Sequence, residues 1–255
     1  MQDLKVTLVQ LDQVWEDKAA NFAKYNSIFE RLEPTNLIVL PEMFQTGFSM
    51  NVEELAEIWE DSPSLQYLQN WSSKLNAAIY TSLIILENGK FFNRGVFVEP
   101  TGEISIYDKR KSFGLGGESL HFTAGNKERI VEYLGWKINL QICYDLRFPE
   151  IARNFLINEL PKYDVLLYVA NWPSKRAHHW KSLLIARAIE NQSYVIGVNR
   201  YGTDGNNLDY SGDSTTINPI GEIDNMISEE GYFSLVLEKE VLFQARKNLP
   251  FLKDY

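Results

Sequence analysis

The chain has a single cysteine, Cys143, among its 255 residues. No internal disulfide can therefore form, which favours a reducing compartment and predicts a cytoplasmic protein. No stretch reaches the roughly 18 uninterrupted apolar residues that a transmembrane helix needs. The charged N-terminal segment MQDLKVTLVQLDQVWED also lacks the apolar centre of a signal peptide. We therefore expect no membrane partner.

Positive charge is scarce, with 25 Lys and Arg against 34 Asp and Glu, so the net charge is −9. Phosphate binding depends on clustered Lys and Arg, and a nucleic-acid partner is therefore not expected. The chain has only three histidines, His121, His178 and His179, and it contains no HExxH, CxxC or Cys/His cluster. The segment GLGGES lacks dinucleotide-binding spacing and no GxxxxGK[ST] is present. These absences predict a protein without a metal or a cofactor.

The remaining composition is that of a folded domain. Hydrophobic residues make up 45% and charged residues 23% of the chain. No linker, repeat or low-complexity tract interrupts it, so we predict a single domain over residues 1–255. The mixed-charge tail 238–255 is predicted to be a C-terminal arm that docks on a surface rather than entering the core.

Apolar periodicity and turn residues predict a strand-rich α/β fold. Helices are expected at 17–32, 64–76, 147–158 and 178–191. Strands are expected at 4–10, 37–40, 78–86, 91–98, 103–108, 129–134, 136–142, 164–170, 194–199, 210–217 and 232–237. Many strands with few helices indicate two packed sheets that are covered by helices.

Three residues that could carry chemistry lie where predicted strands end. Cys143 ends the strand KINLQIC, and a nucleophile at a strand-to-helix turn lies near backbone N–H groups that favour the thiolate. Glu42 follows LIVLP, and Lys109 follows the strand EISIYD. Each residue alone also fits an ordinary structural role. Cys143 fits a small buried core residue, Glu42 fits a carboxylate that caps a loop, and Lys109 fits a solvated surface charge.

Together these residues fall within blocks that resemble a known family. The segments LIVLPEMFQTGF (37–48), IYDKRKSF (106–113), GESLHFTAG (117–125) and QICYDLRFPE (141–150) resemble signature blocks of the nitrilase superfamily, the carbon–nitrogen hydrolases. NWPSKRAHHWKSLLIARAIENQSYVIGVNRYGTDG (171–205) resembles a further block. The resemblance implies a four-layer α/β/β/α sandwich, no cofactor, and a homodimer formed through helices and the C-terminal segment.

The resemblance also implies roles for individual residues. Cys143 corresponds to the nucleophile, Glu42 to the general base and Lys109 to the catalytic lysine that stabilises an oxyanion with the backbone N–H of Tyr144. Glu118 corresponds to a second glutamate that orients Lys109 or the nucleophile. The expected reaction is hydrolysis of an amide by water through a cysteine thioester.

The segment around Cys143 narrows the range of substrates that we expect. Cys-Tyr-Asp at 143–145 resembles the amidase branches, and the block that starts at Asn171 is most similar to bacterial ω-amidases. Those enzymes release ammonia from 2-oxo acid amides such as 2-oxoglutaramate and 2-oxosuccinamate. The alternatives are another amidase of the superfamily, an N-carbamoyl-amino-acid hydrolase, a nitrilase, or a catalytically silent binding protein. A thiol redox protein is disfavoured because the chain has no resolving cysteine.

A 2-oxo acid amide carries a carboxylate, so its pocket needs a cation and an apolar wall. Arg176 is the first choice for the cation, because a guanidinium matches a carboxylate. Lys175 and Arg147 are alternatives, although Arg147 is expected to form a structural ion pair behind Cys143. The predicted apolar lining consists of Phe48, Phe113 and Trp172.

Overall fold

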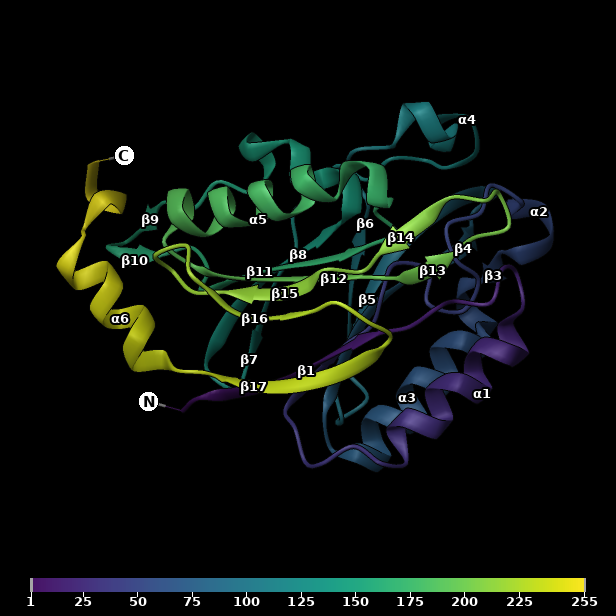
Figure 1. Ribbon diagram of the computed structural model, residues 1–255, viewed down its shortest axis with the longest axis horizontal. Coiled ribbons are helices and arrows are strands. Elements are labelled where there is room, and N and C mark those ends of the chain that lie inside the picture. The colour runs from purple at the N-terminus through teal and green to yellow at the C-terminus, as the bar shows by residue number, and fades with distance from the viewer. Residues whose placement is uncertain (1, 255) are drawn as a thin grey trace.

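Two β-sheets pack face to face in the computed structural model, which describes residues 2–254. Met1 and Tyr255, the two ends of the predicted domain, lie outside the described residues. Figure 1 shows α1 and α3 on one side of the paired sheets and α5 on the other. The order of layers is therefore helix, sheet, sheet, helix, as the sequence predicts.

The first sheet has the order β17-β1-β2-β4-β5-β6, and β3 also pairs with β4. Its central strands β1, β2 and β4 run parallel, whereas β17, β5 and β6 pair antiparallel with their neighbours. The strands are β1 (Leu4–Gln10), β2 (Leu37–Val39), β3 (Glu57–Ile58), β4 (Ala78–Glu87), β5 (Lys90–Val98), β6 (Ile104–Asp108) and β17 (Gly231–Leu237).

The second sheet has the order β16-β15-β12-β11-β8-β7, with β8, β11 and β12 parallel at its centre. Two small hairpins, β9–β10 and β13–β14, lie outside both sheets. The strands are β7 (Ile130–Tyr133), β8 (Trp136–Ile142), β9 (Leu156–Ile157), β10 (Leu160–Pro161), β11 (Val165–Ala170), β12 (Tyr194–Asn199), β13 (Tyr201–Thr203), β14 (Asp209–Ser211), β15 (Ser214–Ile217) and β16 (Ile223–Ile227).

The helices have clear local start signals. Asp17 caps α1 through the backbone N–H of Ala20, and Ser62 caps α3 just before Pro63. The α-helices are α1 (Lys18–Phe29), α2 (Val52–Leu55), α3 (Pro63–Leu75), α4 (Glu118–His121), α5 (Ala177–Asn191) and α6 (Lys239–Asn248). Short 3₁₀ turns cover Trp59–Asp61, Gly114–Gly116, Cys143–Arg147, Pro149–Ile151, Ser174–Arg176 and Phe251–Asp254. None of the helices within residues 2–254 is long and apolar enough to cross a membrane.

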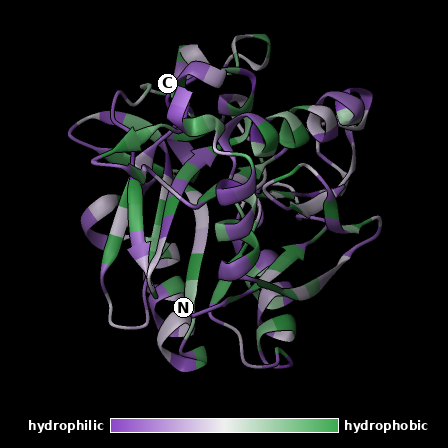
Figure 2. Cartoon of the chain, turned by 90° about the vertical axis from the view of Figure 1, so that its left-hand side faces the viewer, coloured by the Kyte–Doolittle hydropathy of each residue, from purple (hydrophilic) through white to green (hydrophobic). Residues whose placement is uncertain are grey.

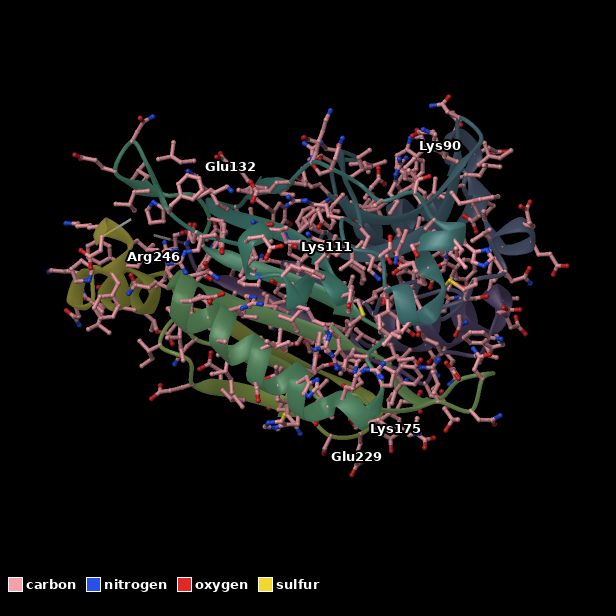
Figure 3. All side chains as sticks on the ribbon, turned by 90° about the horizontal axis from the view of Figure 1, so that it is seen from above. Lys90, Lys111, Glu132, Lys175, Glu229 and Arg246 are labelled. Atoms are coloured by element: carbon pink, nitrogen blue, oxygen red, sulfur yellow. The ribbon has the colours of Figure 1, made fainter. Side chains whose placement is uncertain are left out.

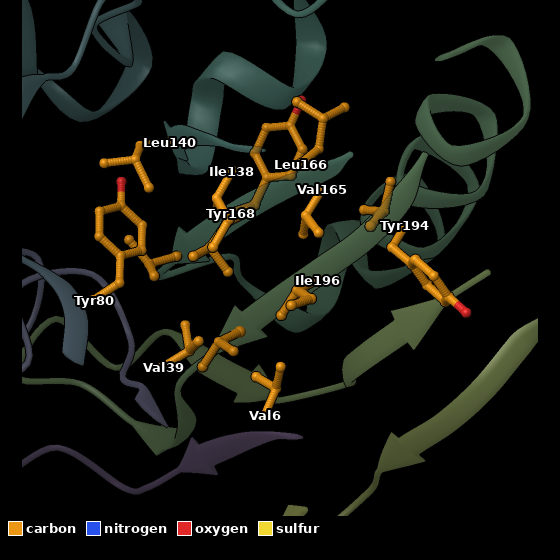
Figure 4. Packing of buried hydrophobic residues seen from close by; sticks show 14 of the residues in the cluster. Val6, Val39, Tyr80, Ile138, Leu140, Val165, Leu166, Tyr168, Tyr194 and Ile196 are labelled. Carbon is orange, nitrogen blue, oxygen red and sulfur yellow. The ribbon is translucent and has the colours of Figure 1, made fainter. Parts of the chain in front are cut away.

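The main core lies between the two sheets. Val6 and Val39 of the first sheet belong to the same buried cluster as Ile138, Leu140 and Ile196 of the second, as Figure 4 shows. A second cluster joins the other face of the first sheet to α1 and α3. Figure 2 shows long hydrophobic segments along the strands and alternating colours on the helices. Both sheets are thus covered on both faces, which explains their nearly continuous apolar runs.

Most predicted elements are confirmed, including the helices near 17–32, 64–76 and 178–191. The predicted strands 78–86 and 91–98 form one antiparallel hairpin, and 129–134 and 136–142 form another. The predicted helix at 147–158 is wrong. Two 3₁₀ turns and the β9–β10 hairpin occupy that segment instead. The side chain of Asn154 donates to the carbonyl oxygens of Tyr163 and Asn191, which holds the chain in an irregular path. Asn158 and Glu159 have positive φ values, as a tight hairpin turn requires.

The predicted strand 210–217 is broken into two strands. Gly212 and Asp213 both have positive φ, and they separate β14 from β15. The strand β16 was missed, and it pairs with β15 across the turn at Asn218. The predicted strand 232–237 is β17, which lies in the first sheet and pairs with β1. An exposed, polar strand such as IDNMI gives little periodic signal.

The C-terminal arm folds onto the end of the second sheet. Asp164, just before β11, accepts hydrogen bonds from Lys239 at 2.7 Å and from Arg246 at 2.8 Å. Arg246 also donates to the carbonyl oxygens of Tyr163 and Gln192. Figure 1 places α6 at the opposite end of the molecule from α4 and the β13–β14 hairpin, and Figure 3 labels Arg246 on this helix.

Candidate active site

Glu42, Lys109 and Cys143 come together at the carboxyl ends of strands from both sheets. Glu42 follows β2 and Lys109 follows β6 in the first sheet, whereas Cys143 follows β8 in the second. Their exposed fractions are 0%, 3% and 8%, so the three groups interact in a nearly water-free place. Charges in such surroundings influence one another strongly.

Lys109 lies between two carboxylates. Its Nζ is 2.9 Å from Glu42 Oε1 and 2.9 Å from Glu118 Oε2. Burial alone would lower the pKa of Lys109, but the charges of Glu118 and Glu42 outweigh it and raise the pKa. The ammonium therefore stays charged. It has three N–H donors, and the two carboxylates leave one for another acceptor.

Asn93, which sequence reasoning missed, binds both carboxylates at once. Its Nδ2 donates to Glu42 Oε1 at 2.7 Å and to Glu118 Oε1 at 3.1 Å. Its backbone oxygen accepts the Lys109 N–H at 3.0 Å. The only signal in the sequence is a polar residue inside the strand KFFNRGVFV. Asn93 thus fixes both Glu42 and Glu118 around Lys109.

Asn171, which follows β11 and begins a block quoted above, holds Glu42 from the second sheet. Its backbone N–H donates to Glu42 Oε2 at 2.9 Å, and its Nδ2 donates to the Glu42 backbone oxygen at 2.6 Å. The Glu42 carboxylate therefore accepts three hydrogen bonds, from the side chains of Lys109 and Asn93 and from the backbone N–H of Asn171. Since a carboxylate offers about four acceptor positions, one remains for a proton donor.

Cys143 has a backbone φ of 46°, in the left-handed region that few non-glycine residues adopt. Its Sγ lies 3.9 Å from the Asn171 backbone oxygen. The expectation that the turn favours a thiolate is wrong for this thiol. Burial raises the pKa of Cys143 well above its ordinary value of 9.0, and the charge of Glu42 raises it further, while Lys109 opposes them. The resting group is therefore a neutral thiol, which needs a base.

A cleft of about 620 Å³ opens above Cys143. All four residues predicted to bind substrate line it: Phe48, Phe113, Trp172 and Arg176. Tyr144, the predicted oxyanion donor, also lies in the wall. The remaining lining residues are Trp15, Glu16, Ser49, Met50, Asn51, Leu115, Gly116, Arg147, Asn171, Pro173, Asp204, Asn206, Leu208 and Tyr210.

Two guanidinium groups face this cleft. Arg176 lies over the Phe113 ring at 5.4 Å, and Arg147 lies over the Trp172 ring at 4.6 Å. Neither has an ion-pair partner among residues 2–254, so the predicted structural ion pair of Arg147 is wrong. Burial lowers the pKa of Arg147, and the charge of Arg176 adds to this effect. Lys175 is exposed, does not line the cleft, and lies at the surface near the start of α5 (Figure 3).

Comparison with known proteins identifies the family. The carbon-nitrogen hydrolase family matches residues 5–232. The chain belongs to this family. An omega-amidase YafV from Yersinia enterocolitica is 41% identical over 256 residues, covering 100% of this chain and 97% of that protein. A 2-oxoglutaramate amidase from Bacillus subtilis is 32% identical, covering 98% of this chain and 96% of that protein.

Solved structures agree with this assignment. XC1258 from Xanthomonas campestris, a CN-hydrolase superfamily protein, has a TM-score of 0.97 and 39% sequence identity, covering 100% of this chain and 98% of that chain. The predicted nitrilase-type fold is thereby confirmed. This carbon-nitrogen hydrolase is an amide-hydrolysing enzyme that resembles ω-amidases. The alternative of a catalytically silent binding protein is not supported.

The wall of the hydrolase cleft is held together by aromatic contacts. The Trp172 indole N–H donates to the Arg176 backbone oxygen at 2.8 Å, so this ring fixes the loop that carries Arg176. The Phe113 ring lies 5.1 Å from the Tyr144 ring, and both line the same cleft as Trp172. Among residues 2–254, no group of three or more His, Cys, Asp or Glu is arranged to hold a metal ion.

Proposed function

We propose that this hydrolase releases ammonia from the ω-amide of small 2-oxo acids, with 2-oxoglutaramate and 2-oxosuccinamate as substrates. The observation that carries the proposal is a pair of guanidinium groups without ion-pair partners, Arg147 and Arg176, in the wall of the cleft that contains Cys143. Two like charges on one wall favour an anionic ligand. The names of the relatives from Yersinia and Bacillus agree with an ω-amide substrate.

In the first half of the proposed reaction, Glu42 takes the proton of the Cys143 thiol while Sγ attacks the amide carbon. The free N–H of Lys109 and the backbone N–H of Tyr144 stabilise the oxyanion that forms. Glu42 then gives the proton to the leaving nitrogen. The C–N bond breaks, ammonia departs, and the acyl group remains on Sγ as a thioester.

In the second half, Glu42 removes a proton from water, which attacks the thioester carbon. The same two N–H groups stabilise the second oxyanion. The C–S bond breaks, Cys143 takes back a proton from Glu42, and the carboxylic acid product gives its proton to solvent and leaves as a carboxylate. The 2.9 Å ion pair between the Lys109 ammonium and the Glu42 carboxylate supports these two roles.

Glu118 acts on Lys109 in this scheme. Its Oε2 accepts the Phe113 backbone N–H at 2.6 Å as well as the lysine ammonium, which ties Lys109 to the segment that carries Phe113. Among the described residues the Cys143 sulfur has a hydrogen bond to the Asn171 backbone oxygen and none to Glu118. We therefore assign Glu118 to the orientation of Lys109 rather than of the nucleophile.

The substrate carboxylate is proposed to bind Arg176, with Arg147 as a second donor. The aromatic rings beneath the two guanidinium groups, Phe113 and Trp172, hold them in place and exclude water from one face of each. Phe48 completes the apolar wall, and its ring lies 5.1 Å from the Lys109 ammonium. The residues proposed to bind the carboxylate and the proposed nucleophile, Cys143, line one cleft, which supports the proposal.

The test is ammonia release from a panel of compounds. It includes 2-oxoglutaramate, 2-oxosuccinamate, glutamine, asparagine, a carbamoyl amino acid, a neutral amide and a nitrile. We expect the two 2-oxo acid amides to have the highest kcat/KM, and the variant C143A to lose at least about 10³-fold in turnover. A carbamoyl amino acid or nitrile as the best substrate would show that one of the alternative activities is correct. Full activity of C143A would disprove the thioester route.

We also propose a cytoplasmic homodimer in which residues 1–255 form one domain and 238–255 a C-terminal arm. The lone cysteine supports the compartment, and exposed apolar side chains on the arm, Phe243, Leu249 and Phe251, support an interface there. Light scattering of the purified protein should give twice the chain mass of 29.5 kDa. A monomer at all concentrations would contradict the dimer.

A further inference from the structure

Asp145 is a fully buried carboxylate two residues after Cys143. Its Oδ2 accepts the Ile142 backbone N–H at 3.0 Å and the Tyr107 hydroxyl at 2.8 Å. Its Oδ1 accepts the Lys111 backbone N–H at 2.9 Å. Among residues 2–254 no cation lies within ion-pair distance of it, so its charge is stabilised mainly by these three hydrogen bonds.

The three donors lie in two segments. One segment carries Lys109 in the first sheet, and the other carries Cys143 in the second sheet. Tyr107 and Lys111 lie two residues before and two residues after Lys109, at the end of β6 in the first sheet. Ile142 directly precedes Cys143, at the end of β8 in the second sheet. One carboxylate thus connects both sides of Lys109 to the backbone next to Cys143.

We propose that Asp145 is a positioning residue that sets the distance between the Lys109 ammonium and the Cys143 sulfur. This inference rests on the proposed roles of Lys109 and Cys143. A displacement of about 1 Å in such a site reduces the rate strongly, because the nucleophile must reach the carbon of the same carbonyl group whose oxygen the oxyanion donor binds. Asp145 lies outside the cleft lining, so its loss should affect kcat more than KM.

A carboxylate suits this position because it offers only acceptors. Asparagine would turn an NH₂ group toward one set of donors, and either the Lys111 N–H or the Ile142 N–H would lose its acceptor. A buried N–H without an acceptor is costly, so the two segments would separate or rotate. The connection therefore depends on the ionised side chain rather than on its shape alone.

The environment of Asp145 makes this connection dependent on pH. Burial raises the pKa of Asp145 to about 6, against hydrogen bonds from Ile142, Tyr107 and Lys111 and the charge of Lys109 that lower it. Tyr107 on β6, Tyr80 on β4 and Tyr168 on β11 face it, and all three have raised pKa values because they are buried, so they stay neutral here. Below about pH 6 the carboxyl gains a proton and loses an acceptor, so activity should fall on the acid side.

The experiment compares D145N and Y107F with two matched controls. D164N makes the same change at a buried carboxylate that holds α6, at the far end of the molecule. Y25F removes a buried tyrosine hydroxyl that has no hydrogen-bond partner among residues 2–254. Each variant is tested for folding by circular dichroism, for kcat and KM with 2-oxoglutaramate, and for alkylation by iodoacetamide. The last readout needs no substrate and reports on Cys143 alone, since the chain has no other cysteine.

We expect D145N to lose at least tenfold in kcat with KM within threefold, and to be alkylated several-fold more slowly, because Lys109 no longer lowers the thiol pKa as strongly. Y107F should move the acid limb of kcat to higher pH, since the Tyr107 hydrogen bond lowers the pKa of Asp145. D164N and Y25F should match the wild type in kcat, acid limb and alkylation rate.

A D145N enzyme with kcat within threefold of wild type at pH 8 would overturn the inference. If D145N does not fold, the Y107F variant provides the test. An acid limb of kcat at the same pH in Y107F as in the wild type would then overturn the inference. The variant C143A separates this result from failure of the proposed function. If C143A stays active, the thiol mechanism is wrong, whereas inactive C143A with fully active D145N removes only the role of Asp145.

Discussion

Asn93 and Lys109 are joined by a 3.0 Å backbone hydrogen bond, and their side chains bind the same two carboxylates. The pairing of β5 with β6 therefore places an amide and an ammonium side by side, facing Glu42 and Glu118. The amide adds two donors without adding charge. This arrangement keeps both carboxylates oriented and leaves Lys109 with a free N–H for the oxyanion.

Two substitutions of Asn93 should therefore lower kcat by different amounts. N93A removes two hydrogen bonds to ionised groups and should lower kcat by at least about tenfold, because the loss of even one such bond costs roughly 1.5–3 kcal/mol. N93D keeps the shape but adds a third carboxylate beside one ammonium, so it should be worse, by about 100-fold. Steady-state kinetics of both variants tests the order, and N93D as active as N93A would show that Asn93 only fills space.

Glu42 and Lys109 should have opposite effects on the reactivity of the thiol. The charge of Glu42 raises the pKa of Cys143 and that of Lys109 lowers it. E42Q should therefore be alkylated by iodoacetamide faster than the wild type at pH 8, and K109A more slowly, although both lose amide hydrolysis. In the wild type, the alkylation rate should still be rising at about pH 9, the ordinary pKa of the thiol. Slower alkylation of E42Q would mean that Glu42 activates the resting thiol directly.

The proposed carboxylate clamp predicts a change in selectivity. R176A and R147A should each lose about 1–3 kcal/mol in kcat/KM for 2-oxosuccinamate, the range for a charged hydrogen bond that is partly exposed. A short neutral amide makes no such contact and should be nearly unaffected. K175A is the matched control, because Lys175 is exposed and lies outside the cleft lining. Equal losses on both substrates would assign the arginines to support of the wall.

The contact of Asp164 with the C-terminal arm predicts a stability effect without a catalytic one. D164N leaves Lys239 and Arg246 without their buried acceptor and should lower the free energy of unfolding by about 1–3 kcal/mol. Thermal denaturation should show a lower Tm, with unchanged kcat well below Tm. An unchanged Tm would indicate that the arm is held by its apolar contacts alone.

The pH dependence of this contact has a defined sign. Burial alone would raise the pKa of Asp164, but the hydrogen bond from Lys239 and the charge of Arg246 outweigh it and lower the pKa below 3.8. A lowered pKa in the folded state stabilises the protein above the unfolded value, near pH 4, and this stability is lost as the pH falls through the folded value. The Tm difference between D164N and the wild type should therefore shrink below pH 4.

The sequence predicted those features that depend on local pattern. Apolar runs and turn residues located most strands, and the family blocks placed Glu42, Lys109, Cys143 and Glu118 together. The segment 147–158 was misassigned because long-range hydrogen bonds of Asn154 override its helical spacing.

Long-range contacts also explain what was missed in the site. Asn93 meets Glu42 51 residues away and Asn171 meets it 129 residues away, and no local pattern reports such contacts. Arg147 was expected to form an ion pair behind the turn at Cys143. Its guanidinium instead lies over the Trp172 ring in the lining of the cleft. The turn at Cys143 was expected to favour an ionised thiol. That expectation left out burial and the charge of Glu42, which both raise the pKa of the thiol.

The division of the site between two sheets has a consequence for folding. Glu42 and Lys109 belong to the first sheet and Cys143 to the second, so each sheet can form its own strands without forming an active site. During refolding, far-ultraviolet circular dichroism should therefore recover before activity does. The return of amide hydrolysis would time the docking of the two sheets, and the single cysteine would report the same event through its slower reaction with alkylating reagents once it is buried.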